Sequence, residues 1–122
     1  MTTRQKYHPW NAKAETWDAI ENRYLMYYSE VHIKMIELIR YIKNSELSKR
    51  LYGSTSMDKL VISIYNPIDY RKESLHIFFN LDTKKWRFEY FAMPYQKAEF
   101  ARNYPEEKGI EKLNKFIESI GW

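Results

Sequence analysis

The sequence has no cysteine, only three glycines and four prolines, and no long apolar run. The lack of cysteine excludes disulfide bonds and thiolate metal sites, and it fits the cytoplasmic location that we expect. The scarcity of glycine and proline, in a chain that is 30% charged and 44% hydrophobic, argues against disorder. No stretch approaches the roughly 18 consecutive apolar residues of a membrane-spanning helix. The start of the chain lacks the apolar segment of a secretory signal, so none is predicted.

Motifs that carry chemistry are also missing. The histidines, His8, His32 and His76, are scattered along the chain and do not have the spacing of metal ligands. No nucleophile, oxyanion donor or phosphate-binding glycine loop is identifiable in the sequence. We therefore predict a protein without enzymatic activity, cofactor or bound metal.

Positive charge is present but dispersed. The net charge is +4, and the basic residues do not form the block of about five or six like charges that makes a basic tail. A mildly basic, solvated surface is the interpretation that we favour over a surface that follows a phosphate backbone.

The chain does contain enough apolar and aromatic side chains for one core. Its 122 residues fit one compact domain, and 17% of them are Phe, Trp or Tyr. We predict a single α+β domain over residues 1–122, in which residues 1–10 form a flexible N-terminal arm.

Helical periodicity dominates the first third of the chain. From Asn11 or Thr16 to about Lys43, apolar side chains recur every three or four residues, and no Gly or Pro interrupts the pattern. The apolar positions are Trp17, Ile20, Tyr24, Tyr27, Val31, Met35, Leu38 and Ile42. The pattern predicts one long helix, followed by a short helix over residues 45–53 that ends at Gly53.

The length of the first helix raises a question of packing. A helix of about 28–32 residues extends about 42–48 Å, whereas a strand of about eight residues reaches only about 26 Å. One end of the helix must therefore overhang the sheet, bend or pack elsewhere. An overhang would expose either Trp17, Ile20 and Tyr24 or Leu38 and Ile42 for self-association into a homodimer or for docking to a partner. Cover within the chain is the interpretation that we favour.

Three later segments have the alternation of β-strands. They cover residues 59–65, 74–81 and 86–93, and polar turns between them predict an antiparallel meander. With a hairpin turn at Thr83 and Lys84, the register pairs Leu81 with Trp86, Phe79 with Phe88, Ile77 with Tyr90 and Leu75 with Ala92. In this register the apolar side of each strand meets the apolar side of its neighbour, which predicts the buried face.

The last part of the chain is predicted to be helical. Residues 95–104 form a helical turn or short helix, and Pro105 takes the first position of a C-terminal helix that Gly121 ends. Its apolar stripe consists of Ile110, Leu113, Ile117 and Ile120, with Phe116 beside it. The predicted fold class is α+β with two layers: a long N-terminal helix and a C-terminal helix packed on a three-stranded antiparallel β-meander, in the order α-α-β-β-β-α.

The stretch KKWRFEYF, residues 84–91, has aromatic side chains at alternate positions after two lysines. In this respect it resembles the signature of RNA-recognition motifs, whose aromatic side chains stack on bases. The glycines of that signature and its order of strands and helices are missing, and the register buries Trp86, Phe88 and Tyr90. Core packing is therefore predicted for these rings.

The opposite face of the sheet is less polar than the exposed side of a two-layer domain usually is. It carries our candidate partner-binding residues: Tyr65, His76, Phe78, Arg87, Glu89, Phe91 and Met93. The aromatic side chains and Met93 would anchor a protein partner, while His76, Arg87 and Glu89 would fix its orientation. The sequence leaves open whether a loop or the C-terminal helix covers part of this face.

A small cysteine-free α+β domain without catalytic signals is similar in overall form to many bacterial immunity and inhibitor proteins. That similarity implies a non-enzymatic protein-binding domain that neutralises a cognate toxin by occluding it, with a toxin domain as its partner. It implies no site residues.

Two other functions are weighed against this one. The first is nucleic-acid binding through a basic and aromatic surface that includes Lys84, Lys85, Arg87 and the basic segment at residues 40–50. The second is proton transfer by His76 and Glu89, which the register places diagonally, about 7–8 Å apart. An ordinary surface pair is the interpretation that we favour for these two side chains.

Overall fold

The computed structural model describes residues 11–28, 32–93 and 97–122, so the predicted arm at residues 1–10 lies outside the described residues. The elements follow in this order: β1 (Asn11–Ala12), α1 (Trp17–Arg23), a π-helical turn (Tyr24–Tyr28), α2 (Ile33–Asn44), a 3-10 turn (Glu46–Lys49), β2 (Tyr52–Ser56), β3 (Lys59–Ser63), β4 (Ile68–Asp69), β5 (Ser74–Asn80), β6 (Lys85–Phe91), β7 (Phe100–Pro105), a second 3-10 turn (Glu106–Lys108) and α3 (Gly109–Ile120).

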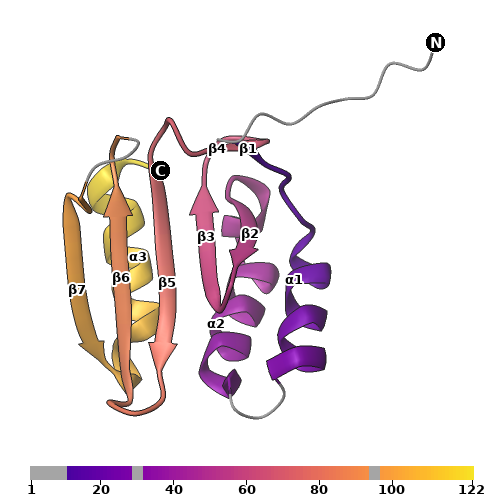
Figure 1. Ribbon diagram of the computed structural model, residues 1–122, viewed down its shortest axis with the longest axis vertical. Helices are drawn as coiled ribbons and strands as arrows, with labels where there is room; N and C mark the ends of the chain where they lie inside the picture. The colour runs from indigo at the N-terminus through magenta and orange to yellow at the C-terminus, as the bar shows by residue number, and fades with distance from the viewer. Residues whose placement is uncertain (1–10, 29–31, 94–96) are drawn as a thin grey trace.

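The fold is α+β, as predicted, but its sheet is larger than the predicted meander. Five antiparallel strands lie in the order β2-β3-β5-β6-β7, and α1, α2 and α3 lie on one side of them (Figure 1). The apolar sides of the helices and the strands meet in one continuous core. The strands β1 and β4 form a separate small ladder at one end of the sheet.

The predicted long N-terminal helix is wrong, because this part of the chain forms a helical hairpin. After α1 and the π-helical turn the chain reverses, and α2 returns beside α1 (Figure 1). A straight helix would outreach the sheet, whereas the reversal lets both halves of the apolar stripe cover it. Trp17, Ile20, Tyr24, Leu38 and Ile42 are all buried in the core of the chain. The overhang that we considered for homodimer formation therefore does not exist.

The helix α1 begins at the later of the two predicted N-caps. Thr16 Oγ1 accepts a hydrogen bond of 3.1 Å from the backbone N–H of Ala19, which satisfies one of the free donors at the helix start. Asn11, the earlier candidate, instead belongs to β1 and pairs with Asp69 of β4.

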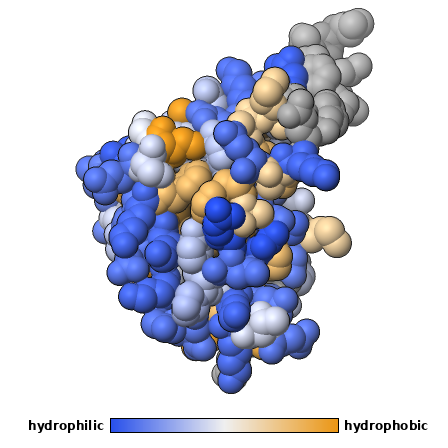
Figure 2. Space-filling model, turned by 90° about the vertical axis from the view of Figure 1, so that its left-hand side faces the viewer, coloured by the Kyte–Doolittle hydropathy of each residue, from blue (hydrophilic) through white to orange (hydrophobic). Residues whose placement is uncertain are grey.

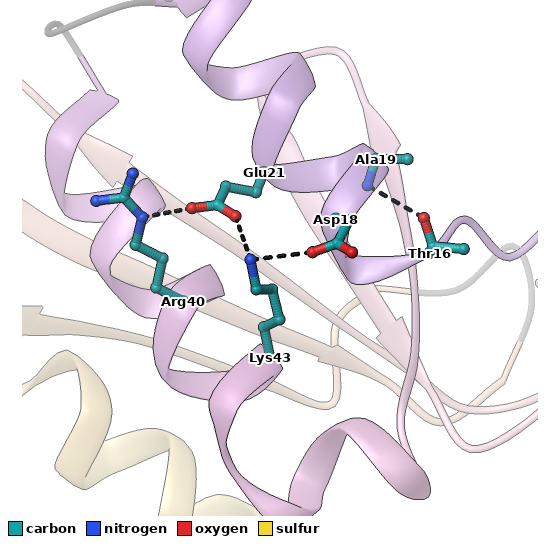
Figure 3. A network of polar contacts seen from close by, with 6 residues as sticks. All are labelled: Thr16, Asp18, Ala19, Glu21, Arg40 and Lys43. Carbon is teal, nitrogen blue, oxygen red and sulfur yellow. Dashed lines mark hydrogen bonds and ion pairs between the residues drawn. The ribbon is translucent and has the colours of Figure 1, made fainter.

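Ion pairs hold α1 and α2 together on their outer side (Figure 3). The carboxylate of Glu21, a buried residue of α1, accepts hydrogen bonds from Arg40 Nε and, at 2.7 Å, from Lys43 Nζ. Lys43 Nζ also lies 2.9 Å from Asp18 Oδ1. The hydrogen bond from Lys43, followed by that from Arg40, lowers the pKa of Glu21 and outweighs the effect of burial. Such an arrangement favours the hairpin over a straight helix, in which these side chains would lie far apart.

The predicted second helix is reduced to the 3-10 turn Glu46–Lys49, and Gly53 does not end it. Gly53 lies in β2, where Trp17 and Ile20 of α1 approach its backbone closely. A Cβ at this position would lie 2.8 Å from both Trp17 Cη2 and Ile20 Cδ1. A glycine is therefore needed at this position because α1 approaches β2 closely. From the sequence pattern alone, this reason for a glycine could not be distinguished from the end of a helix.

The three predicted strands correspond to β3, β5 and β6, but the register of the hairpin differs by two residues. Phe79 pairs with Trp86, Ile77 with Phe88 and Leu75 with Tyr90. The connection takes four residues, 81–84, of which Lys84 has a φ of 54°, so the turn begins earlier than predicted. Because side chains alternate with a period of two, a shift of two residues leaves every side chain on its predicted face. Trp86 and Phe88 are 3% and 0% exposed, which confirms core packing.

The predicted helix at residues 95–104 is wrong where the structure describes it, because Phe100–Pro105 forms strand β7 beside β6. Phe100 and Tyr104 point toward the helices, and the Tyr104 ring lies 5.2 Å from that of Phe88. Pro105 is the last residue of β7 and not the first residue of the C-terminal helix. On the side away from β5, the backbone N–H and C=O groups of β6 need hydrogen-bonding partners. Pairing with them favours a strand here more strongly than the local sequence favours a helix.

The C-terminal helix is present as α3, and Gly121 ends it as predicted, with a left-handed φ of 77°. Leu113 and Ile117 are buried, whereas Ile110, which we placed in the same stripe, is 38% exposed. The helix begins at Gly109, against the indole of Trp86. The buried side of α3 is therefore narrower than the sequence pattern indicated.

Candidate functional site

The side of the sheet opposite the helices carries aromatic rings among charged side chains. Side chains of β3, β5 and β6 that do not enter the core point to this side. They form the outer-face patch, which consists of Lys59, His76, Phe78, Arg87, Glu89 and Phe91, while Val61 of β3 points to the same side but is fully buried. Helix α3 packs on the other side of the sheet, and no helix in the part of the chain that the structure describes lies over the patch (Figure 1).

The imidazole of His76 is packed within the patch. Its ring centroid lies 4.7 Å from that of Phe91, and its Nε2 lies 3.2 Å from Ser74 Oγ. Burial, followed by the nearby Lys59 ammonium, lowers the pKa of His76 to about 4, against the opposite effect of Glu89. At neutral pH His76 is therefore an uncharged ring that takes part in packing and hydrogen bonding.

We expect His76 to make the stability of the protein depend on pH in a defined range. As the pH falls, the unfolded chain binds a proton at pKa 6.5, before the folded protein does at about 4. The stabilisation that the lowered pKa of His76 adds to the free energy of unfolding is fully present above pH 6.5, and it is lost as the pH falls from there toward about 4. From these pKa values, about 2 kcal/mol is lost between about pH 7.5 and about pH 5.

Urea unfolding at these two pH values checks this expectation. The wild-type protein should lose more stability than the His76→Gln variant, by about 2 kcal/mol. Equal losses in the two proteins would show that the folded state protonates His76 as readily as the unfolded chain does.

The carboxylate of Glu89 is the centre of a charged group on the patch. Lys59 Nζ lies 3.4 Å and Arg87 Nε lies 3.6 Å from its two oxygens. The same Lys59 ammonium lies 5.2 Å from the centre of the Phe78 ring, in the arrangement of a cation–π contact. Arg87 also donates a hydrogen bond of 3.3 Å to Asn103 Oδ1 on β7. These contacts connect four strands, β3, β5, β6 and β7, and orient the charges around the rings.

Five of the seven candidate residues share the patch: His76, Phe78, Arg87, Glu89 and Phe91. The expected diagonal placement of His76 and Glu89 is wrong, because the two residues are direct cross-strand partners. Tyr65 and Met93 lie beyond the ends of β3 and β6. The ring of Tyr65 instead has the Lys72 ammonium 4.4 Å from its centre, and Met93 is 58% exposed. The register shift of two residues accounts for the error in the His76–Glu89 pairing.

Three residues that take part in these contacts were missed by sequence reasoning: Lys59, Ser74 and Asn103. Lys59 and Ser74 stand at strand positions whose parity already places them on the outer face, so alternation was a sufficient signal for them. Asn103 belongs to β7, which was predicted to be helical, so no sequence signal placed it beside Arg87.

A proton-transfer role for His76 and Glu89 gains no geometric support. Three pockets that described residues line are located elsewhere: about 470 Å³ beside Trp17, about 490 Å³ between β7 and α3, and about 420 Å³ between α2 and α3. His76 contacts the Ser74 hydroxyl, while Glu89 contacts the two cations. Among the described residues, no three His, Asp or Glu side chains gather closely enough to hold a metal ion.

The basic residues considered for nucleic-acid binding are divided between two parts of the molecule. Lys84 and Lys85 lie at the β5–β6 turn of the sheet. Arg40 and Lys43 lie on α2 and are paired with Glu21. These positions do not form one continuous basic strip.

Comparison of the chain with protein-family models, with curated proteins and with solved structures gave no match. Within the described ranges, no helix combines the length and the apolar character that crossing a lipid bilayer requires.

Proposed function

We propose that the protein is a non-enzymatic protein-binding domain of the immunity or inhibitor type, which neutralises a bacterial toxin by occluding it. The outer-face patch is the surface that contacts the toxin. The observation that carries this proposal is the position of Phe78 and Phe91, which are partly exposed rings held among oriented charges on a sheet. Aromatic side chains that are half exposed before binding and become buried afterwards are typical of binding hot spots.

The rigidity of the patch supports a role in tight binding. Phe91 packs against His76, and Phe78 lies beneath Lys59, so neither ring has to be ordered when a partner arrives. A surface that is already ordered loses little conformational entropy on association. The charged group around Glu89 adds orientation, since a partner with mismatched charges would leave these groups desolvated and unpaired.

The size of the face indicates how much of the protein the partner touches. Five strands about 4.8 Å apart, with five to seven residues each, give a face of roughly 480 Å². A standard protein interface takes about 800 Å² from each partner. The partner is therefore expected to reach past the strands, toward the exposed Met93 beyond the end of β6.

The proposal is tested by capture of the partner and by rescue of its toxicity. Wild-type protein and the variants Phe78→Ala and Phe91→Ala are used to capture binding proteins from the native host, and affinities for the captured protein are then measured. Each variant should bind about 5–30-fold more weakly, which corresponds to about 1–2 kcal/mol for each ring. Bacteria that express the captured protein should grow only when the wild-type chain is produced with it.

The variant Tyr27→Ala is the matched control, because Tyr27 is a ring that is 74% exposed on the π-helical turn and does not belong to the outer-face patch. It should bind like the wild type. If both patch variants capture the partner normally with their fold intact, or if the captured protein is harmless to bacteria, the proposal is wrong.

A further inference from the structure

A groove with an aromatic floor lies at the edge of the sheet, between β7 and α3. Figure 2 shows an apolar patch, bounded by hydrophilic residues, on this side of the molecule. The groove has a volume of about 490 Å³, and Tyr90, Phe100 and Phe116 contribute to its lining. It is separate from the outer-face patch, because these three side chains point to the helix side of the sheet.

The rings that line the groove support one another. The Phe116 ring lies 5.3 Å from Tyr90, 6.1 Å from Phe100 and 5.8 Å from Trp122, measured between centroids. Tyr90 is also fixed at its hydroxyl, which donates a hydrogen bond of 2.6 Å to Glu73 Oε2. The groove is therefore formed before any ligand enters it, which keeps the entropic cost of binding low.

Strand β7 offers main-chain hydrogen bonds next to this groove. It is the edge of the sheet, and in the described ranges only β6 pairs with it. Along an edge strand, alternate N–H and C=O groups point away from the sheet and are available to another extended chain. A strand that pairs with β7 would direct every second side chain toward the helix side, into the groove.

The rim of the groove is positively charged. Lys112 and Lys115 of α3 line it, and Arg102 lies beside it, with its guanidinium 5.0 Å from the centre of the Phe100 ring. The only carboxylate among its lining residues is that of Glu99. Within the part of the chain that the structure describes, none of the three cations has a carboxylate within salt-bridge distance. The charge of the rim therefore favours an acidic ligand.

From these features we propose that the groove binds an extended segment of a partner protein, which pairs with β7 as an additional strand. The segment carries a large apolar side chain that enters the groove, with Asp or Glu two positions away on either side. The apolar side chain rests on Phe100 and Phe116, and the carboxylates reach Lys112 and Lys115. Strand addition of this kind combines main-chain hydrogen bonds for affinity with a side-chain pocket for specificity.

A second copy of this chain is a poorer occupant of the groove. Two-fold pairing of one β7 with another would bring two sets of Arg102, Lys112 and Lys115 together on the same side of a joined sheet. Such like charges repel, and the chain already has a net charge of +4. An acidic segment of a different protein removes this repulsion.

The proposal is tested with a synthetic probe and the full-length protein. The probe is a peptide of about nine residues with Phe at its centre, Glu two positions away on either side, and Thr elsewhere. Binding is followed by fluorescence anisotropy, and the position of the bound peptide is found from amide shifts in ¹⁵N–¹H NMR spectra. The amides of β7 and the first turns of α3 should shift, and the affinity should fall as salt is added.

Two control peptides separate the contributions of charge and of strand pairing. A peptide with Lys in place of Glu should bind at least about tenfold more weakly. A peptide with N-methylated amides at alternate positions should also lose binding, because it cannot donate the hydrogen bonds of a strand.

The charge-reversed protein Lys112→Glu/Lys115→Glu should bind the acidic peptide at least about tenfold more weakly than the wild type. Lys13→Glu/Lys49→Glu is the matched control. Like the groove variant, it changes the net charge from +4 to 0, but its two substitutions are at exposed positions outside the groove. Phe78→Ala should bind the peptide normally, so failure here is distinguishable from failure of the outer-face patch.

Several results would overturn the proposal. These are the absence of shifts in β7 and α3 up to about 1 mM peptide, equal binding of the Lys peptide, equal losses in the two charge-reversed proteins, and dimers formed through β7 in sedimentation experiments.

Discussion

Replacing Trp86 by alanine is expected to lower the free energy of unfolding by about 3–5 kcal/mol, the range for large rings removed from a core. The side chain of Trp86 is 3% exposed, and its ring lies 5.1 Å from Phe79 and 6.5 Å from Phe88 between centroids. Its Nε1 donates a hydrogen bond of 2.9 Å to the carbonyl oxygen of Glu106, so the variant also leaves that acceptor without its partner. Urea unfolding measures the loss.

The same experiment decides between a core role and a base-stacking role for this ring. Leu81→Ala is the control, because Leu81 is 42% exposed in the same β-hairpin, and the change should cost less than about 1 kcal/mol. A base-stacking role for Trp86 predicts the opposite behaviour, with unchanged stability and weaker binding of single-stranded RNA at low salt. That outcome would contradict the packing described above.

Replacing Gly109 by alanine is expected to destabilise the protein by about 1–3 kcal/mol, although alanine is the better helix former. A Cβ at Gly109 would lie 2.5 Å from Trp86 Cε2 and 2.6 Å from its Nε1. The indole is held by its own hydrogen bond and by neighbouring rings, so it cannot move aside without loss elsewhere. Helix propensity alone predicts a gain of up to about 1 kcal/mol, so the sign of the change identifies the cause.

A double-mutant cycle tests this cause directly. In a Trp86→Ala background, Gly109→Ala should no longer destabilise the protein, because the contact that it would violate is gone. Gly121→Ala is the control: Gly121 has a φ of 77° and no atom within 4 Å of an added Cβ, so its cost of about 1 kcal/mol comes from backbone strain. That cost should be the same with and without Trp86. A destabilisation by Gly109→Ala that persists without the indole would contradict the explanation.

The faces of the sheet were predictable because they depend only on parity. Leu75, Ile77, Trp86 and Phe88 stand at alternate positions of β5 and β6, and a period of two sends them to one side. This signal tolerates an error of two residues, which explains why the wrong register still gave the right buried face. Five members of the outer-face patch followed from the same parity.

The strands β2 and β7 were not predictable from their own residues. The sequence YGSTS of β2 has a glycine and three small polar side chains, and FARNYP of β7 ends in proline. Both strands lie at the edges of the sheet, where pairing with β3 or β6 supplies the hydrogen bonds that local preference does not. The groove between β7 and α3 was invisible for the same reason.

By itself, the sequence determined the α+β class, the three central strands, the side of each strand that is buried and the end of α3 at Gly121. These features follow from short-range periodicity and from the backbone freedom of glycine. Only the tertiary structure decided that the first helix reverses, that five strands are paired, and that an edge groove lies between β7 and α3. Each of these depends on contacts between residues far apart in the chain, such as Glu21 with Arg40 and Trp86 with Gly109, and local patterns carry no information about such contacts.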